Sequence, residues 1–151
     1  MPRIDETRTV PYTPDQMYDL VADVASYPEF LPWTAAARIR SREDMGDHEV
    51  MEADLVVGFK GFRERFGSRV RLFPDAKRIE TEYLDGPFRH LKSEWTFREA
   101  AEGCEVRFWV DFEFRNPIFK RLIGVVFDEA MRRIIGAFEG RARKLYGDRA
   151  A

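Results

Sequence analysis

Apolar and polar side chains alternate with a period of two over most of residues 36–115, which is typical of β-strands that bury one face. The alternation is clearest at 104–115, where apolar residues occupy every second position without a slip. The same pattern, less regular, recurs at 36–43, 50–57, 60–73, 77–84 and 91–98. With a short polar edge strand at 3–10, it predicts an antiparallel sheet of about six or seven strands with one solvated face.

Two short helical segments are expected after the first strand. Thr13 can cap a helix in which Pro14 takes the first position and Gln16 completes a capping box. The apolar face of this helix then carries Met17, Leu20, Val21 and Val24. The segment Tyr27–Trp33 holds large apolar side chains between prolines, and we expect a turn or a single helical turn that presents them.

A long helix is predicted at the C-terminal end of the chain. Asn116 is its expected cap, Pro117 takes its first position and Gly147 ends it. Apolar residues recur at spacings of three or four along it: Phe119, Ile123, Phe127, Ala130, Ile134, Phe138, Ala142 and Leu145. The part Ile118–Phe127 is apolar almost all round, so it is either a buried helix end or the lid of a binding site.

These elements predict an α+β fold in which the curved sheet wraps around the long helix. We expect one domain over residues 1–147 and a short polar tail at 148–151. The inner face would carry many large rings, whereas a helix with its side chains is only about 10–12 Å wide. We therefore expect an apolar cavity beside the helix, because an apolar ligand there would restore the packing contacts that an empty cavity loses.

Polar side chains are also expected on the inner face. Ser68 shares a strand face with Phe66, and Ser93 shares one with Trp95. Buried polar groups need partners, and the oxygen atoms of a ligand head group would supply them. Glu64 has the same parity as Ser68, so it either points inward, protonated or paired, or is solvated near a strand end or bulge.

Composition narrows the class of protein. A content of 44% hydrophobic and 14% aromatic residues excludes a disordered chain. The single cysteine, Cys104, excludes an internal disulfide and a cysteine-rich metal cage. No segment has the roughly 20 apolar residues of a membrane span, and the first residues lack a signal-peptide core. We expect a soluble intracellular protein.

Candidate catalytic groups are sparse. His48 and His90 lie at polar turns, Cys104 has inward parity, and no nucleophile, metal-protease or phosphate-loop motif occurs. Asp111 and Glu113 share the solvated face of a strand, where we expect them to pair with arginines on neighbouring strands. The sequence therefore favours a protein that is not an enzyme and holds neither a metal nor a resident cofactor.

The basic residues are compatible with more than one kind of binding partner. One strand face carries Arg63, Arg65, Arg69 and Arg71. With 25 Lys and Arg against 27 Asp and Glu, the net charge of −2 favours a solvated outer face balanced by acids, and DNA is not an expected partner. Contact of these arginines with anionic lipid head groups or with ribosomal RNA is the alternative, and it would be salt-dependent.

Four motifs in register resemble the coenzyme-Q-binding, START-like family within the polyketide cyclase/dehydrase-like superfamily. They are D-V-x-x-Y-P-x-F-L-P-W at 23–33, D-G-P-F-x-x-L-x-x-x-W-x-F at 85–97, F-E-F at 112–114 and A-F-E-x-R-A at 137–142. The family also includes the bacterial ribosome association toxin RatA. Many members carry a cysteine after the Pro-Trp pair, whereas this chain has Thr34, so it cannot use a thiol at that position.

The resemblance implies a helix-grip fold whose internal tunnel takes a lipid, ubiquinone in the respiratory members, without catalysis. The protein would then be a carrier or chaperone in the cytoplasm that meets the inner face of the membrane transiently. The expected ligand-binding residues are Tyr27, Phe30, Leu31, Trp33, Phe62, Phe66, Tyr83, Trp95, Phe97, Phe108, Phe112, Phe119, Ile123 and Phe127. A ribosome-binding regulator that blocks subunit association is the alternative. Because related helix-grip proteins include cyclases and aromatases, an enzyme is a third hypothesis.

Overall fold

The computed structural model describes residues 3–59 and 61–147, except for the side chains of Phe59, Phe62, Phe119, Ile123 and Val126. The polar tail predicted at 148–151 lies outside this range. The elements, in chain order, are β1 (Arg3–Val10), α1 (Pro14–Ala22), the 3₁₀ helix η1 (Val24–Glu29), β2 (Thr34–Asp44), β3 (Glu49–Phe59), β4 (Phe62–Phe73), β5 (Arg78–Asp85), β6 (Phe88–Ala100), β7 (Gly103–Phe114) and α2 (Pro117–Tyr146).

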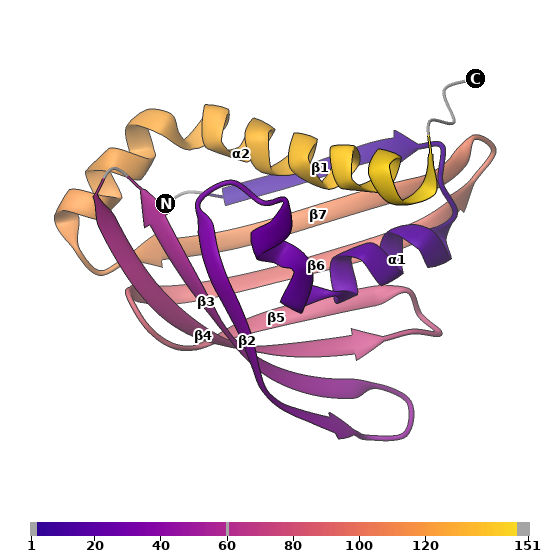
Figure 1. Cartoon of the computed structure of the whole chain (residues 1–151), viewed down its shortest axis with the longest axis horizontal. Coiled ribbons are helices and arrows are strands. Elements are labelled where there is room, and N and C mark those ends of the chain that lie inside the picture. The colour runs from indigo at the N-terminus through magenta and orange to yellow at the C-terminus, as the bar shows by residue number, and fades with distance from the viewer. Residues whose placement is uncertain (1–2, 60, 148–151) are drawn as a thin grey trace.

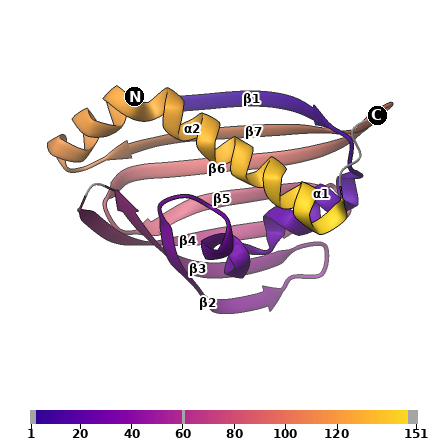
Figure 2. The same ribbon diagram turned by 45° about the horizontal axis from the view of Figure 1, so that its top comes forward.

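The strands form one curved antiparallel sheet of seven strands in the order β1-β7-β6-β5-β4-β3-β2. Figures 1 and 2 show α2 running across the concave side of this sheet, with α1 beside the C-terminal part of α2. The predicted helix-grip arrangement is confirmed. The strand expected at 36–43 has only a weak alternation because β2 contains register shifts between Thr34 and Ala36 and between Ile39 and Ser41.

The predicted start of α1 and both predicted ends of α2 are confirmed, whereas Val24, expected on the face of the first helix, begins η1 because α1 ends at Ala22. Thr13 accepts a hydrogen bond through Oγ1 from the backbone N–H of Gln16 (3.1 Å), whose Oε1 accepts from the Thr13 N–H (3.0 Å). Asn116 caps α2 by accepting from the Ile118 N–H at 2.8 Å. Gly147 ends α2 with a φ of 87°, a conformation that a residue without Cβ adopts at low cost.

One end of the concave face is tightly packed. Met51 is 1% exposed, and Ala53, Cys104 and Ala142 are fully buried in the cluster that α1 and the C-terminal part of α2 form with the sheet. Burial raises the pKa of the Cys104 thiol to about 11, so the sulfur stays protonated and packs as a small core residue. This end is the main folding core.

Hydrogen bonds across this packed end fix the C-terminal part of α2. The Tyr12 hydroxyl donates to the Gly147 carbonyl oxygen at 2.8 Å, and the Tyr146 hydroxyl donates to the Gln16 carbonyl oxygen at 2.9 Å. Arg8 of β1 reaches Glu139 of α2 at 3.3 Å. The last turns of α2 are therefore tied to β1, to α1 and to the loop between them.

The outer face of the sheet carries ladders of ion pairs. Arg69 contacts Glu52 and Glu82, each at 3.1 Å, from the middle of three strands. Asp54 is held by Arg40 and by Arg65, and their guanidinium groups lower its pKa below the usual range. Most of the predicted basic face is thus balanced by acids, as a solvated outer surface requires.

The structure decides between the two alternatives for Glu64 and corrects the expectations for His48 and Asp111. Glu64 is exposed because it lies near the β3–β4 turn, opposite Val57, so the solvated alternative holds. His48, which was expected at the surface, is half-buried because its ring stacks on Phe73 with centroids 4.8 Å apart. Asp111 pairs with His90 at 3.3 Å rather than with an arginine, although the register places Arg3 of β1 directly opposite it on one side and Lys92 of β6 on the other.

Glu113, on the same strand face, has a mixed outcome. Its carboxylate contacts Lys120 of α2 at 2.9 Å and Arg89 of β6 at 4.0 Å. The lysine comes from the first turn of α2, which follows β7 directly in the chain. Alternation along strands could not predict that contact, because it crosses from the sheet to the helix.

Candidate functional site

A cavity of about 270 Å³ lies between the middle of α2 and the inner face of the sheet. The strands contribute Leu55, Phe66, Ser68, Val70, Ile79, Thr81, Phe88, Leu91, Ser93, Trp95, Phe108, Val110 and Phe112. The helices and the loop after η1 contribute Val21, Val24, Tyr27, Leu31, Met131, Ile134 and Phe138. The wall is therefore predominantly apolar and draws on β3 to β7, as the curvature of the sheet requires.

Aromatic rings form one end of the cavity. Phe88 stacks on Phe114 (centroids 4.6 Å apart) and meets Phe66 edge-on at 5.3 Å and Phe112 at 5.9 Å. Phe127 of α2 reaches the same cluster through Phe112, at 5.9 Å. Such edge-to-face and stacked pairs are favourable ring geometries, so this end of the cavity has a defined shape.

Trp95 and Phe108 divide the main cavity from a smaller one. Their ring centroids are 4.3 Å apart, and Phe138 of α2 lies 5.0 Å from Trp95. The smaller cavity, of about 40 Å³, lies on the β1 side of these rings and has Glu6, Arg8 and Glu139 at its rim. Its volume is too small for a ligand of the size the main cavity accepts.

Six of the expected ligand-binding residues line the main cavity: Tyr27, Leu31, Phe66, Trp95, Phe108 and Phe112. Tyr83 and Phe127 instead pack behind the wall, against Phe88 and Phe112 respectively. Phe30 lies between Tyr27 and Phe138, with the Arg141 guanidinium 5.1 Å from its ring centroid. The side chains of Phe62, Phe119 and Ile123 lie outside the described part of the structure.

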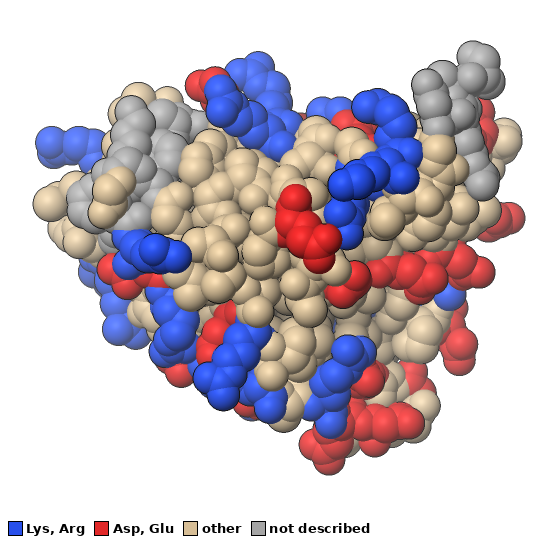
Figure 3. All heavy atoms as spheres, in the orientation of Figure 1, with Lys and Arg blue, Asp and Glu red and all other residues tan. Residues whose placement is uncertain are grey.

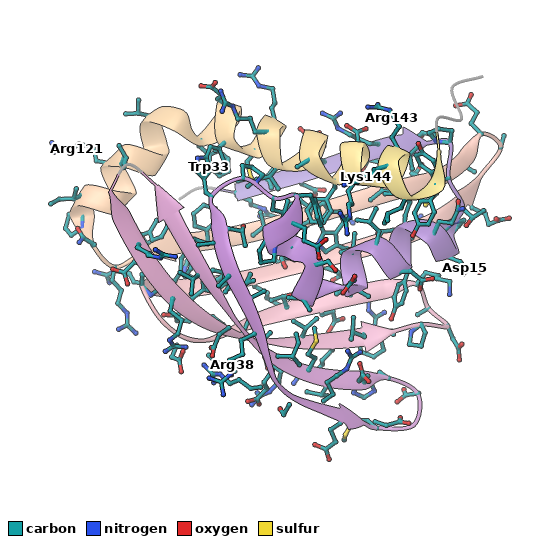
Figure 4. The ribbon with its side chains drawn as sticks, viewed as in Figure 1. Asp15, Trp33, Arg38, Arg121, Arg143 and Lys144 are labelled. Carbon is teal, nitrogen blue, oxygen red and sulfur yellow. The ribbon has the colours of Figure 1, made fainter. Side chains whose placement is uncertain are left out.

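Phe97 and Trp33 do not line the cavity. Phe97 points inward as its parity requires, but it lies farther along β6, beneath α1, where its ring meets Tyr18 edge-on at 6.0 Å. Trp33 is half-buried at the start of β2, on the side of the sheet that α2 covers (Figure 4). Its φ of 61° turns the chain from η1 into β2, a rare conformation for a bulky residue that alternation does not predict.

Several wall residues were not among those expected. Ile134 and Phe138 belong to the apolar stripe of α2, so the helical period already contained the signal for them. Phe88 had no such signal, because its parity along β6 points it outward. A register shift between Phe88 and His90 turns it inward, and such a shift is set by strand pairing.

The polar groups in the wall are neutral. The Tyr27 hydroxyl donates to the Val21 carbonyl oxygen at 2.5 Å, and burial raises the pKa of this phenol well above its usual range. The remaining wall hydroxyls belong to Ser68, Thr81 and Ser93. Within the described residues, no cluster of histidine, cysteine or carboxylate groups could hold a metal ion. The cavity is therefore suited to a neutral, mainly apolar molecule.

The surface over the cavity is largely uncharged. Figure 3 shows a broad area of neutral side chains on the face where α2, η1 and β2 meet, with an acidic side chain near its centre, Lys and Arg groups above and below it, and Asp and Glu groups along its right border. Arg121 extends outward from the N-terminal part of α2 (Figure 4). None of the helices, over their described residues, is long and apolar enough to cross a membrane.

A seven-stranded sheet that grips a C-terminal helix around an apolar cavity defines a START-like helix-grip domain. The chain belongs to the family described as "Polyketide cyclase / dehydrase and lipid transport", which matches residues 10–139. It is 41% identical to the ribosome association toxin RatA of Rickettsia prowazekii, over 92% of this chain and 94% of the relative.

Two further comparisons connect the chain to other named proteins. It is 33% identical to the mitochondrial coenzyme Q-binding protein COQ10 homolog B of Xenopus laevis, over 94% of this chain and 58% of that protein. The crystal structure of the ZhuI aromatase/cyclase of a Streptomyces species superposes with a TM-score of 0.81, covering 99% of each chain at 20% identity. That last likeness shows the fold alone.

Proposed function

We propose that this protein binds ubiquinone, or a similar isoprenoid quinone, in the cavity beneath α2 and carries it without chemical change. The observation that carries the proposal is the apolar cavity of about 270 Å³ with a small number of neutral polar groups in its wall. A relative of the chain is named a coenzyme Q-binding protein, which supports the same ligand class.

The size of the cavity limits how much of the ligand it can enclose. An engineered cavity of about 150 Å³ in another protein binds benzene. A volume of about 270 Å³ therefore suits a substituted ring and roughly the first isoprene unit of its tail. The rest of a long tail would leave the cavity along α2, toward the apolar segment Ile118–Phe127.

That segment is our proposed contact with the membrane. Ile118 is 62% exposed and Val125 is 80% exposed, and the exposed cations Arg115 and Arg121 lie on or next to the same part of the chain. Apolar side chains beside cations favour a bilayer surface that contains anionic lipids. We place the protein in the cytoplasm, at the inner face of the membrane when it loads or releases its ligand.

The composition of the wall supports a role without catalysis. Tyr27 is the titratable side chain among the wall residues, and its hydroxyl is engaged by a backbone carbonyl. Acid–base catalysis needs a group whose pKa lies near the working pH, and the raised pKa of Tyr27 moves it away from that range. We therefore propose a carrier or chaperone in preference to an enzyme of the cyclase type.

Extraction of the purified protein with organic solvent, followed by mass spectrometry, tests the proposal. We expect a co-purified quinone. In titrations with ubiquinones of increasing tail length, each buried CH₂ is worth about 0.8 kcal/mol, so affinity rises with the first units and then levels off. An extract without quinone, together with no binding of any added quinone, would refute the proposal.

A second candidate function is contact with the ribosome. The name of the Rickettsia relative favours it, and so do Arg38 and Arg63, which are exposed and form no ion pair within the described residues. Figure 4 shows Arg38 on the outer side of the sheet, away from α2. In a sedimentation profile, the protein would reduce the 70S peak at low salt, and the doubly substituted Arg38→Glu, Arg63→Glu protein would not. An unchanged profile with the unsubstituted protein excludes this function.

A further inference from the structure

A row of hydroxyl groups crosses the apolar wall of the cavity. Ser68 belongs to β4, Thr81 to β5 and Ser93 to β6, and all three line the cavity. The register places Thr81 directly opposite Ser93, while Ser68 is diagonal to Thr81 because Val70 is opposite it. Directly opposed Cβ atoms lie about 4.5–5.5 Å apart and diagonal ones about 7–8 Å, so the three hydroxyls form one continuous polar strip.

These hydroxyls face the cavity without a protein partner. Ser68 is 3% exposed and Ser93 is 9% exposed, while Thr81 is half-buried. Within the described residues, none of the three side chains makes a hydrogen bond, whereas the Tyr27 hydroxyl in the same wall is satisfied by the Val21 carbonyl oxygen. A hydroxyl that faces the cavity needs a partner from whatever fills the cavity, whereas valine or alanine in the same places would need none. A ligand oxygen would supply that partner.

The surroundings of the strip match a flat ring. Trp95 follows Ser93 by two residues on the same face of β6, a separation of about 6.6 Å at 3.3 Å per residue. Phe66 precedes Ser68 in the same way on β4. Rings on both sides of the strip would stack on or meet edge-on a ligand ring whose oxygens reach the hydroxyls.

We propose that Ser68, Thr81 and Ser93 form the head-group subsite of the cavity, where they donate hydrogen bonds to the carbonyl or methoxy oxygens of a quinone ring. This inference rests on the proposed function. It adds an orientation, with the ring at the strip and the tail directed along α2. It also names the residues that distinguish an oxygenated ring from an isoprenoid hydrocarbon of equal size.

Because a serine or threonine hydroxyl both donates and accepts, the strip serves two forms of the ligand. It can donate to the carbonyl oxygen of a quinone or accept from the hydroxyl of a quinol. The subsite therefore offers a hydrogen bond to both the oxidised and the reduced ring. A carrier with this property exchanges its ligand without selecting its redox state.

The test uses the triple variant Ser68→Ala, Thr81→Val, Ser93→Ala and two probes. One probe is ubiquinone with one isoprene unit, and the other is prenylbenzene, which has the tail but no oxygen. We expect the triple variant to lose at least tenfold in affinity for the quinone and to bind prenylbenzene as the unsubstituted protein does. Thr96→Val, on the outer face of β6, is the matched control and leaves both affinities unchanged.

A spectroscopic measurement keeps the test independent of any folding defect in the triple variant. In the unsubstituted protein, hydrogen bonding should lower the infrared carbonyl stretching frequency of the bound quinone below its value in an alkane solvent. An unshifted frequency, or equal quinone affinities in the triple variant and the unsubstituted protein, overturns the head-group subsite and leaves the proposed function standing. Failure of the unsubstituted protein to bind either probe instead overturns the proposed function.

Discussion

The two ends of the concave face are built from the same alternating strands but have different interiors. At one end, α1 and the C-terminal part of α2, which includes Ala142, lie together over Met51 and Cys104, and the cavity beside this core has a volume of only about 40 Å³. At the other end, α2 and η1 lie farther from the sheet, and the cavity of about 270 Å³ opens between them and the rings of Phe66 and Phe112.

The difference shows where stability and binding come from in this fold. Small residues such as Ala53 and Ala142 let the second layer approach the packed end closely. At the hollow end, large rings of the sheet face α2 and η1 across the cavity. We infer that the packed end supplies most of the folding free energy and that the hollow end is left free for a ligand. Substitutions that affect one end and spare the other test this division.

Shortening a side chain at the packed end has the largest expected effect. Met51→Ala leaves a cavity in a fully packed core and should lower the free energy of unfolding by about 2–5 kcal/mol, measured by urea denaturation. Met45→Ala is the matched control, because Met45 is 51% exposed and its loss should change stability by no more than about 0.5 kcal/mol. Equal effects of the two substitutions would show that the packed end is not the main core.

Enlarging a side chain should have opposite effects on stability at the two ends of the concave face. Ala142→Leu overfills the packed end and should cost about 1–3 kcal/mol of stability. Val110→Phe extends into the cavity, so it should leave stability unchanged or higher while abolishing quinone binding. The measurements are thermal unfolding and ligand titration of both variants. A Val110→Phe protein that still binds the quinone with full affinity would show that the ligand lies elsewhere.

Removing one hydrogen bond at the packed end has a smaller effect. Tyr146→Phe deletes the bond to the Gln16 carbonyl oxygen and should reduce stability by about 0.5–1.5 kcal/mol. Tyr18→Phe serves as the control, because Tyr18 packs through its ring and its hydroxyl makes no hydrogen bond within the described residues. If both variants unfold at the same urea concentration, the bond does not help to hold α2.

The smallest effect concerns pH and the outer face. Arg40 and Arg65 lower the pKa of Asp54 below its ordinary value of 3.8, so the folded state favours the ionised carboxylate. The resulting stability is present above about pH 4 and is lost as the pH falls through the lowered pKa. Asp54→Asn should therefore flatten the acid side of the stability curve. Asp75→Asn, at an exposed site without an ion pair in the described part of the chain, should keep the original curve.

The sequence was informative wherever a local rule decides the structure. The unbroken alternation of β7, the capping box at Thr13 and the Asn116-Pro117 start of α2 each predict an element that the structure contains. The inward direction of Ser68 and Ser93 was equally predictable, because it follows from parity within a regular strand. These features depend on neighbouring residues alone.

Other parts of the site depend on tertiary structure. The inward direction of Phe97 followed from parity, but its place in the packed core depends on where α1 lies along the sheet. Phe88 enters the cavity through a register shift, and Glu64 is exposed because it lies near the β3–β4 turn. Strand pairing and helix position determine all three, and a pattern read along one chain contains neither.

The fluorescence of Trp95 offers the most direct test of a ligand in the hollow end. Trp95 lines the cavity, whereas Trp109 lies on the outer face of β7, with the Arg3 guanidinium 5.5 Å from its ring centroid. A protein with Trp33→Phe and Trp109→Phe keeps Trp95 as its only tryptophan, and one with Trp33→Phe and Trp95→Phe keeps only Trp109.

A quinone ring quenches the fluorescence of a tryptophan by short-range electron transfer. We expect ubiquinone with one isoprene unit to quench the emission of Trp95 saturably and to leave the emission of Trp109 unchanged. A folded protein whose Trp95 emission does not change at saturating quinone would contradict a ligand in this cavity.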